Sequence, residues 1–469
     1  MTVIGAMDPS NKTGKASPPK QSAVLHRDIH VIPKKAVGGK GSYIFLEDGQ
    51  KLLDSTGGAA VSCLGHGNEQ VNQAMISQIN QLSFCHSGFF GTQAFEELAS
   101  FLVESTGGKL SRLFVISSGS EAMEAAMKLA RQYFLELPTP QPQRHRFIAR
   151  RQSYHGITLG ALSMGGHAGR RAPFTPLLLP NISHVSPCYP YRGRRDGELD
   201  ADYVARLAEE LDAEFQRVGP ETVCAFVAEP IVGAALGCVP ALPGYLPAMK
   251  AVCDRYGALL ILDEVMCGMG RSGTLHAWEQ EGVVPDIQTM GKGLGGGYAP
   301  VSGVLIASKI VDALDKGTGV FKHGQTYQGH PVSCAAALTV QKIIKEQNLL
   351  ENVRNMGTLL EHELRIRLGD HPNVGDIRGK GLFWGIEFVK VKETKEPFDP
   401  KLGVASRLQE TALKPEYSIS LYPGTGTVDG TRGDHVLLAP PYNSTKEEIE
   451  FIASTTARVV EDVFGRLEA

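Results

Sequence analysis

The chain has 469 residues, of which 42% are hydrophobic and 21% are charged, and its formal net charge is −3 at pH 7. This is the composition of a globular protein that can form two or more lobes around a sizeable core. The small net charge gives no reason to expect a nucleic-acid partner or a membrane surface, and no apolar stretch reaches the roughly 18 residues of a transmembrane helix.

Residues 1–27 are polar and contain Pro, Ser and Lys. They lack the apolar core of a signal peptide and are poor in arginine, so a flexible leader is favoured over a transit peptide. The eight cysteines are scattered, with no C-x-x-C pair and no histidine spacing of a zinc site. We therefore expect reduced thiols, a cytoplasmic protein and no bound metal.

The folded region opens with "GSYIFLEDGQKLLDSTGG", where Asp48 and Gly49 predict the turn of a hairpin. The segment 28–65 is expected to join a smaller domain formed mainly by the C-terminal part of the chain. Helices are predicted over about 69–82 and 93–105.

Apolar strands then alternate with helices. The strands are expected near 113–116, 145–151, 223–230, 259–265 and 300–308. Such alternation predicts an α/β fold with a mostly parallel sheet covered on both faces, here a large domain over 66–320. A long helical stretch over 332–369 and a final strand and helix predict a smaller α/β domain over 321–469.

The loop "SSGSEA" (117–122) ends a strand and begins a helix. Gly119 allows close backbone approach, and the free amides of a helix N-terminus favour a phosphate. Ser118 and Glu121 also fit a capping box, which is the stronger interpretation if the loop is considered alone.

The strand "LLILDEV" ends in two acids, Asp263 and Glu264. Ligands of α/β sheets bind at the carboxyl ends of parallel strands, so one of these acids is expected to point into a site. An N-cap or loop acid is the alternative for an isolated aspartate. A buried carboxylate needs a cationic or hydrogen-bonding partner, such as a protonated ring nitrogen.

Lys292 follows the next short strand and is surrounded by glycines in "DIQTMGKGLGGGYAP". A nucleophilic lysine must become neutral, which desolvation or a neighbouring cation favours. A surface lysine is the ordinary alternative. An anion site, a strand-end acid and a glycine-flanked amine in this order match the needs of a phosphorylated pyridine aldehyde.

With these motifs the chain resembles the class III, pyridoxal-phosphate-dependent aminotransferases, from about residue 40 to the C-terminus. The most specific block is 259–305, and "SSGSEAMEAAMKLAR", "SYHGITLGALS", "AEPIVGA" and "GQTYQGHPVSCAAAL" are also similar. The resemblance implies the fold type I architecture of aspartate aminotransferase, pyridoxal 5'-phosphate as cofactor, and a homodimer with shared active sites.

For individual residues, the resemblance implies that Lys292 forms the Schiff base and shuttles a proton, while Asp263 pairs with the ring nitrogen. Tyr154 and Val265 would pack on opposite faces of the ring, although a lone tyrosine more often packs in a core. Glu229 would lie near the ring's O3' atom or the substrate pocket.

At the phosphate end, Gly119 and Ser120 would hold the anion together with Ser118. Thr326 in "QTYQGHP" would reach the phosphate of the partner subunit.

The chain departs from the family pattern at two positions. Met266 and Val232 stand where glutamine is common, which argues against the ornithine branches and for the broader ω-aminotransferase branch. Arg378 and Arg432 are candidates for a substrate carboxylate, because a guanidinium binds that anion bidentately. For both, a structural ion pair is nearly as good an interpretation. Phe89, with its neighbour Phe90, would line the pocket entrance or pack in the core.

The implied reaction moves an amino group from an amine or amino acid to a 2-oxo acid by a ping-pong mechanism. A racemase, an epimerase or a lyase on the same fold is the alternative, because the bond that breaks depends on how the substrate is held. A catalytically silent scaffold is a third possibility, and the presence of both Lys292 and Asp263 argues against it.

Overall fold

The computed structural model describes residues 22–468. Residues 1–21, which make up most of the expected leader, lie outside the described part of the chain. Within residues 22–468, no helix combines the length and the apolar character needed to cross a bilayer.

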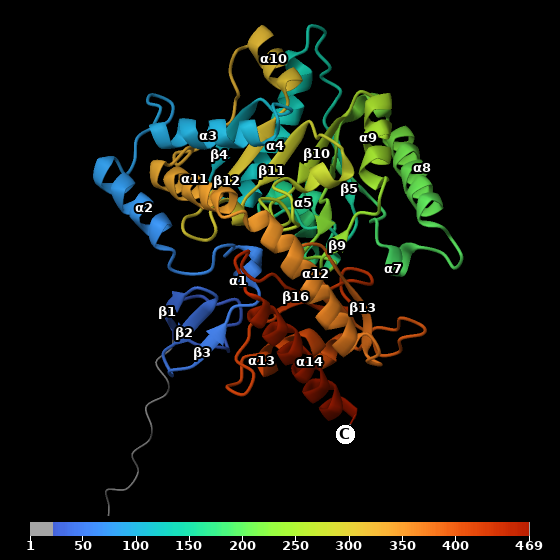
Figure 1. Cartoon of the computed structure of the whole chain (residues 1–469). Helices are drawn as coiled ribbons and strands as arrows, with labels where there is room; N and C mark the ends of the chain where they lie inside the picture. Colours follow the sequence, from blue (N-terminus) through green and yellow to red (C-terminus); the bar gives the residue numbers. More distant parts are fainter. Residues whose placement is uncertain (1–21, 469) are drawn as a thin grey trace, which may run out of the picture.

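A seven-stranded sheet forms the centre of the large domain, in the order β4-β12-β11-β10-β7-β5-β6 (Figure 1). Its strands are β4 (Arg112–Ile116), β5 (Arg146–Arg150), β6 (Ile182–Val185), β7 (Val223–Ala228), β10 (Leu259–Asp263), β11 (Ile287–Met290) and β12 (Ser302–Ile306). The pairings among β11, β10, β7, β5 and β6 are parallel. The expected α/β fold with a mostly parallel sheet is confirmed.

One strand runs against the others. β12 is antiparallel to both β11 and β4. The connection from β11 to β12 is a glycine-rich loop that contains only the short 3-10 helix Lys292–Leu294, with no crossover helix. A parallel return requires a longer crossover, so the chain turns back antiparallel at this point.

Helices cover both faces of this sheet. α4 (Gly119–Glu136), α5 (Leu159–Met164) and α10 (Ser308–Lys316) share one face, while α3 (Gln93–Ser105), α8 (Asp200–Val218), α9 (Tyr245–Arg255) and α11 (Pro331–Glu346) lie on the other. Within β4, Phe114 and Ile116 pack with α4, whereas Val115 packs with α3 and α11. The alternation of side chains along a strand thus supplies an apolar surface to both layers.

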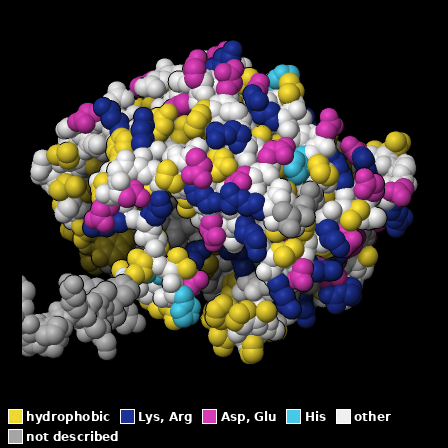
Figure 2. Space-filling model, turned by 90° about the horizontal axis from the view of Figure 1, so that it is seen from below, with side chains coloured by type: hydrophobic (Ala, Val, Ile, Leu, Met, Phe, Trp, Pro, Cys, Tyr) yellow, Lys and Arg dark blue, Asp and Glu magenta, His cyan; other side chains and the backbone are white. Residues whose placement is uncertain are grey.

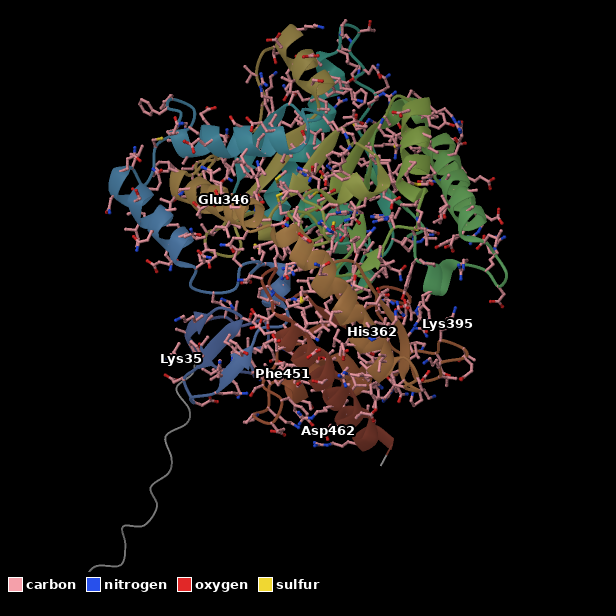
Figure 3. The ribbon with its side chains drawn as sticks, viewed as in Figure 1. Lys35, Glu346, His362, Lys395, Phe451 and Asp462 are labelled. Carbon is pink, nitrogen blue, oxygen red and sulfur yellow. The ribbon has the colours of Figure 1, made fainter. Side chains whose placement is uncertain are left out.

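The smaller domain combines both ends of the described chain (Figure 1). Its antiparallel sheet, in the order β13-β14-β16-β15, packs against three helices. These elements are β13 (Val374–Gly379), β14 (Trp384–Phe388), β15 (Tyr422–Thr425), β16 (Asp434–Leu438), α12 (Leu349–Leu368), α13 (Val404–Ala412) and α14 (Lys446–Glu468). Figure 3 labels His362 on α12 and Phe451 on α14, whose side chains are both exposed.

The N-terminal hairpin lies beside this domain. A small sheet comprises β1 (Ala36–Lys40), β2 (Tyr43–Leu46) and β3 (Lys51–Leu53), with Gly49 at a positive φ of 86° in the predicted turn. Leu53, at the end of β3, forms an isolated parallel β-bridge with Ile419. The hairpin therefore joins the smaller domain through backbone pairing.

The predicted helical stretch 332–369 is two helices, α11 and α12. The break occurs at Asn348, which has a positive φ of 50° and precedes α12. α11 packs on α2 (Glu69–Gln81) and α3 as well as on α12. The remaining elements are α1 (Gly57–Ala60), α6 (Ala168–Arg171), α7 (Pro190–Gly193), β8 (Ile231–Val232), β9 (Val239–Pro240) and the 3-10 helices Ala172–Leu177, Pro220–Thr222, Ala277–Glu281 and Pro400–Leu402.

The face seen from below carries basic and acidic side chains side by side (Figure 2). No broad region of a single sign covers this face.

Candidate active site

The site is formed at the carboxyl ends of the parallel strands. β4, β5, β7, β10 and β11 point the same way, so the segments that follow them meet at one edge of the sheet. These segments carry Gly119, Tyr154, Glu229, Asp263 and Lys292. Residues far apart in the sequence are thereby brought together, as expected for an α/β sheet.

Asp263 is the last residue of β10 and is 4% exposed. Its Oδ2 atom lies 2.7 Å from Nδ1 of His155. Its Oδ1 atom accepts hydrogen bonds from Thr289 Oγ1 at 3.1 Å and from the Val265 amide at 3.0 Å. These contacts hold the carboxylate in one orientation.

Glu264, the adjacent acid, belongs to a different environment. Its carboxylate accepts hydrogen bonds from the amides of Ala277 and Trp278 at 2.7 and 2.8 Å, and from Gln288 Nε2 at 3.1 Å. Burial raises the pKa of Glu264 to about 8. The two acids thus divide their roles: Glu264 holds the 277–278 segment, while Asp263 is left for the site.

Lys292 begins a 3-10 helix after β11 with a positive φ of 45°. Desolvation lowers the pKa of its amine to about 8, against the opposing charges of Asp263 and Glu229, and the Arg271 guanidinium lowers it further. Within residues 22–468, the amine has no hydrogen bond or ion pair. A half-buried amine that is neither paired nor strongly basic is suited to act as a nucleophile.

The N-terminus of α4 supplies free donors. The Ser118 hydroxyl accepts from the Glu121 amide at 3.3 Å and donates to Glu121 Oε2 at 2.9 Å, so Ser118 is the N-cap of α4. The amides of Gly119 and Ser120 have no acceptor in the described part of the chain. An 18-residue helix presents its positive end at these donors.

Gly119 and Val265 lie against each other. A Cβ atom at Gly119 would come within 2.8 Å of Val265 Cγ1. The nearby 154–157 loop is held to the same helix, because the Ile157 amide donates to Ser120 Oγ at 3.0 Å. The helix terminus, Val265 and this loop therefore form one packed unit.

Tyr154 and Glu229 are linked. Glu229 is 4% exposed and accepts from the Tyr154 amide at 3.0 Å and the Gly233 amide at 3.2 Å. Burial raises the pKa of Glu229, and burial likewise raises the pKa of Tyr154. The Arg150 guanidinium donates to the backbone carbonyl of Glu229 at 2.6 Å and so helps to hold this residue in place.

Arg378 is part of a buried ion-pair cluster. Its guanidinium contacts Glu387 at 2.7 Å and Asp376 at 2.9 Å, and it donates to the carbonyls of Gly237, at 2.9 Å, and Leu236. A substrate carboxylate would have to displace two carboxylates that already occupy it. The structure therefore favours the ion-pair interpretation of Arg378 over the substrate-binding one.

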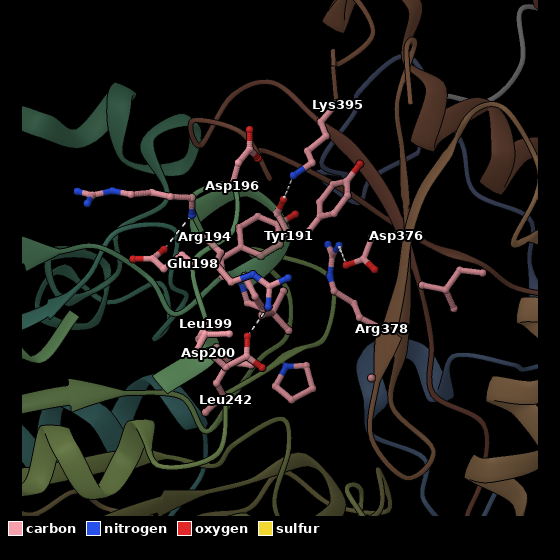
Figure 4. Close-up of a pocket in the computed structure, with 18 of the residues that line it drawn as sticks. Tyr191, Arg194, Asp196, Glu198, Leu199, Asp200, Leu242, Asp376, Arg378 and Lys395 are labelled. Carbon is pink, nitrogen blue, oxygen red and sulfur yellow. Dashed lines mark hydrogen bonds and ion pairs between the residues drawn. The ribbon is translucent and has the colours of Figure 1, made fainter. Parts of the chain in front are cut away.

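Arg378 also lines a cleft of about 920 Å³ between the two domains (Figure 4). Of the basic side chains on its walls, Arg194, Arg365 and Arg378 are each paired with a carboxylate. Neither Lys292 nor Asp263 lines this cleft. It is thus separate from the candidate active site.

The remaining expected site residues are exposed. Arg432 is paired with Asp429 at 2.7 Å, within its own loop. Phe89 is 78% exposed and lies against His86, so it is not part of the core of the chain. Thr326 is exposed, and its neighbour Gln325 reaches Ser117 Oγ at 3.4 Å.

Sequence patterns did not point to His155 or Thr289 as site residues, although both contact the Asp263 carboxylate. His155 lies inside the quoted "SYHG" motif, next to Tyr154, and this adjacency was the available signal. Thr289 lies on β11, opposite Asp263 in the register of the two strands. The contact between Thr289 and Asp263 depends on the register of β10 and β11, which the sequence alone does not reveal.

These residues fit pyridoxal phosphate. The free amides of Gly119 and Ser120 suit a phosphate, Asp263 suits a protonated ring nitrogen, and the unpaired amine of Lys292 suits an aldehyde. Residues at one sheet edge thus provide the three interactions that the group requires.

Comparisons with known proteins agree with this geometry. The sequence profile of the family described as aminotransferase class-III matches residues 22–460. An aminotransferase of Gibberella zeae is 56% identical over 442 residues, which are 94% of this chain and 86% of the relative.

Two solved structures are also similar. An (S)-enantioselective omega-transaminase of Thermomicrobium roseum is 37% identical with a TM-score of 0.86, over 92% of this chain and 93% of that one. A PLP-bound amine transaminase from an uncultivated Pseudomonas species is 31% identical, also with a TM-score of 0.86, over 97% of this chain and 99% of that one.

Proposed function

The chain belongs to the class III aminotransferases and is a pyridoxal-phosphate-dependent transaminase; from this premise we propose that Lys292 binds the cofactor covalently and that two copies of the chain share each active site. The observation that carries the first proposal is the unpaired amine of Lys292, whose pKa is lowered to about 8.

Different residues of the site would contact the phosphate, the ring faces and the ring nitrogen of the cofactor. Gly119 and Ser120 hold the phosphate through their amides, and Tyr154 and Val265 confine the ring from its two faces. Asp263, oriented by His155 and Thr289, keeps the ring nitrogen protonated. When bound, the cofactor supplies an electron-withdrawing ring that stabilises negative charge on the substrate.

Proton transfer falls to Lys292. Nζ would take the proton from the substrate α-carbon and pass it on to the bound cofactor, because return to the same carbon would leave the amino group untransferred. A pKa of about 8 allows the amine to act as base and, once protonated, as acid near neutral pH. Glu229, which accepts from the Tyr154 amide, would lie near the ring's O3' atom or the substrate.

Exposed apolar side chains support the homodimer. Phe84, Phe89, Phe90 and Tyr327 are 39, 78, 63 and 57% exposed, and the rings of Phe84 and Tyr327 lie 5.7 Å apart. A gathering of this kind marks an association surface. Because Thr326 lies beside Tyr327, the proposed assembly would carry Thr326 of the partner subunit to the phosphate.

The donor is an amine or amino acid and the acceptor a 2-oxo acid. A racemase or lyase would use the same residues, but the family and the relatives described above are aminotransferases. A cytoplasmic location is also part of the proposal, since all eight cysteines are free.

The reaction can be tested with donor alone. A transaminase given amine and no 2-oxo acid should release one equivalent of carbonyl product per active site and then stop. Adding pyruvate should restart it. Continued release without acceptor would indicate a lyase, and inversion of the donor without release would indicate a racemase.

A further inference from the structure

Two arginines that have no role in the mechanism above lie near Tyr154. The Arg170 guanidinium carbon is 4.8 Å from the centroid of the Tyr154 ring. Burial raises the pKa of Tyr154, and the positive charges of Arg170 and Arg27 act in the opposite direction. The phenol therefore has the charges of two arginines, as well as that of Asp263, within electrostatic reach.

Among the described residues, neither guanidinium has a carboxylate partner that would neutralise it. Within residues 22–468, the side chains of Arg170 and Arg27 make no ion pair and no hydrogen bond. Arg432 and Arg378 differ, because each is paired with carboxylates of the chain. Arg170 is only partly exposed, so its charge is less well solvated than that of a surface arginine.

The backbone around Arg170 is held in place by the smaller domain. The Gly169 amide donates to the Gly430 carbonyl at 2.9 Å. His167 contacts the Thr425 carbonyl through Nε2 at 3.0 Å and accepts from the Arg170 amide through Nδ1 at 3.4 Å. These hydrogen bonds hold α6, which carries Arg170, against the 425–433 loop.

We propose that Arg170 binds the carboxylate of amino-acid donors and 2-oxo-acid acceptors, and so determines a preference for carboxylate-bearing substrates over simple amines. This inference rests on the proposed function, because it places the substrate beside Tyr154. A planar guanidinium binds a carboxylate with two parallel hydrogen bonds, and its aromatic neighbour limits its rotation. Arg27 adds a second positive charge near the same phenol.

Binding can be measured without any reaction. The holoenzyme is titrated calorimetrically with 3-phenylpropionate and with 3-phenylpropionamide, which lack an amine and differ in charge. Wild type should bind the acid more tightly than the amide. Arg170→Gln should weaken binding of the acid roughly 10- to 100-fold and leave binding of the amide unchanged. Arg170→Lys, which keeps the positive charge, should weaken binding of the acid less than Arg170→Gln does.

Arg171→Gln is the matched control. Arg171 lies on the same short helix, and its guanidinium faces His184 at 3.3 Å. The control should leave both affinities unchanged. The inference is overturned if wild type does not prefer the acid, if Arg170→Gln weakens both compounds alike or neither, or if the control has the same effect.

Kinetics provide a second readout that separates this inference from the proposed function. Release of carbonyl product is compared for an amino acid and for the amine that lacks its carboxylate. Arg170→Gln should lower kcat/KM for the amino acid roughly 10- to 100-fold and spare the amine. If wild type releases product from neither donor, the proposed reaction fails, whereas the calorimetric result still decides the role of Arg170.

Discussion

The amine of Lys292 lies in surroundings that disfavour its charged form. Desolvation outweighs the attraction of Asp263 and Glu229, and Arg271 adds a repulsion. Asp263, by contrast, receives three hydrogen-bonding contacts that suit a carboxylate. One neighbourhood therefore holds both an amine that loses its proton readily and a carboxylate fixed by three contacts.

Replacing Lys292 should abolish covalent attachment of the cofactor. We expect Lys292→Ala to retain its fold, to show no turnover and to release cofactor on denaturation without a covalent remnant. Borohydride reduction followed by peptide mapping should label the peptide that carries residue 292 in wild type and no peptide in the variant. A label on another lysine would refute the assignment.

Replacing Asp263 should leave the cofactor bound but slow the reaction. Asp263→Asn removes the charge that would hold the ring proton, and loss of one partner of a buried charge pair costs about 3–5 kcal/mol. Proton abstraction should therefore slow roughly 10²- to 10⁴-fold. The measurement is single-turnover kinetics with an α-deuterated donor, and near-native rates would mean that another group supports the ring.

The pH dependence of Lys292 can be measured in the apoenzyme. A lowered pKa means that the neutral amine gains population as pH rises through about 8, and roughly a tenth is neutral at pH 7. Acylation of the residue-292 peptide should follow that midpoint, whereas exposed lysines titrate near ~10.4. A midpoint above pH 10 for Lys292 would contradict the desolvated environment.

At the scale of single elements, the N-terminus of α4 depends on a glycine. A Cβ at residue 119 would meet Val265 Cγ1 at 2.8 Å. We expect Gly119→Ala to displace Val265 at a cost of about 1–3 kcal/mol and to weaken cofactor retention. Dialysis against a cofactor-free buffer, followed by assay of bound cofactor, measures the loss.

The control for this prediction is Gly465→Ala in α14. No atom lies within 4 Å of a Cβ placed there, so the extra methyl meets open space. This variant should retain cofactor like wild type, and its unfolding free energy should rise by up to about 1 kcal/mol because alanine favours a helix. Equal retention in both variants would show that the close approach at Gly119 has no role in cofactor binding.

At the scale of the whole molecule, the proposed sharing of each active site between two subunits can be tested with mixed dimers. If Thr326 acts across the interface, a heterodimer of Thr326→Ala and Lys292→Ala chains has one site with both lesions and one with neither. Such heterodimers should show roughly half the wild-type rate, given independent sites.

The contact of Gln325 with Ser117 in the same chain supports the competing interpretation, in which Thr326 is a local loop residue. If Thr326 acts only within its own chain, each active site of the heterodimer carries one lesion. Purified heterodimers with only the low activity of singly damaged sites would therefore refute the shared site. Thr326→Ala homodimers, which should retain cofactor less well than wild type, provide the reference.

The sequence predicted the elements of this molecule better than their pairing. Apolar runs located the strands of the central sheet except β6 (Ile182–Val185), and the capping residues located α4. The direction of β12 was not predicted, since an apolar run looks the same in a parallel and an antiparallel strand. The break at Asn348 also escaped prediction, because the apolar pattern continues through it.

The sequence by itself determined the α/β class, the family, the cofactor and the positions of Lys292 and Asp263, because short motifs with fixed spacing encode them. Only the tertiary structure decided the surroundings of each charge. It paired Arg378 with Glu387 and Arg432 with Asp429, turned Glu264 away from the site, and left Arg170 unpaired beside Tyr154. The physical reason is that burial and partners set the role of a charged group, and those partners come from strands and loops far apart in the chain.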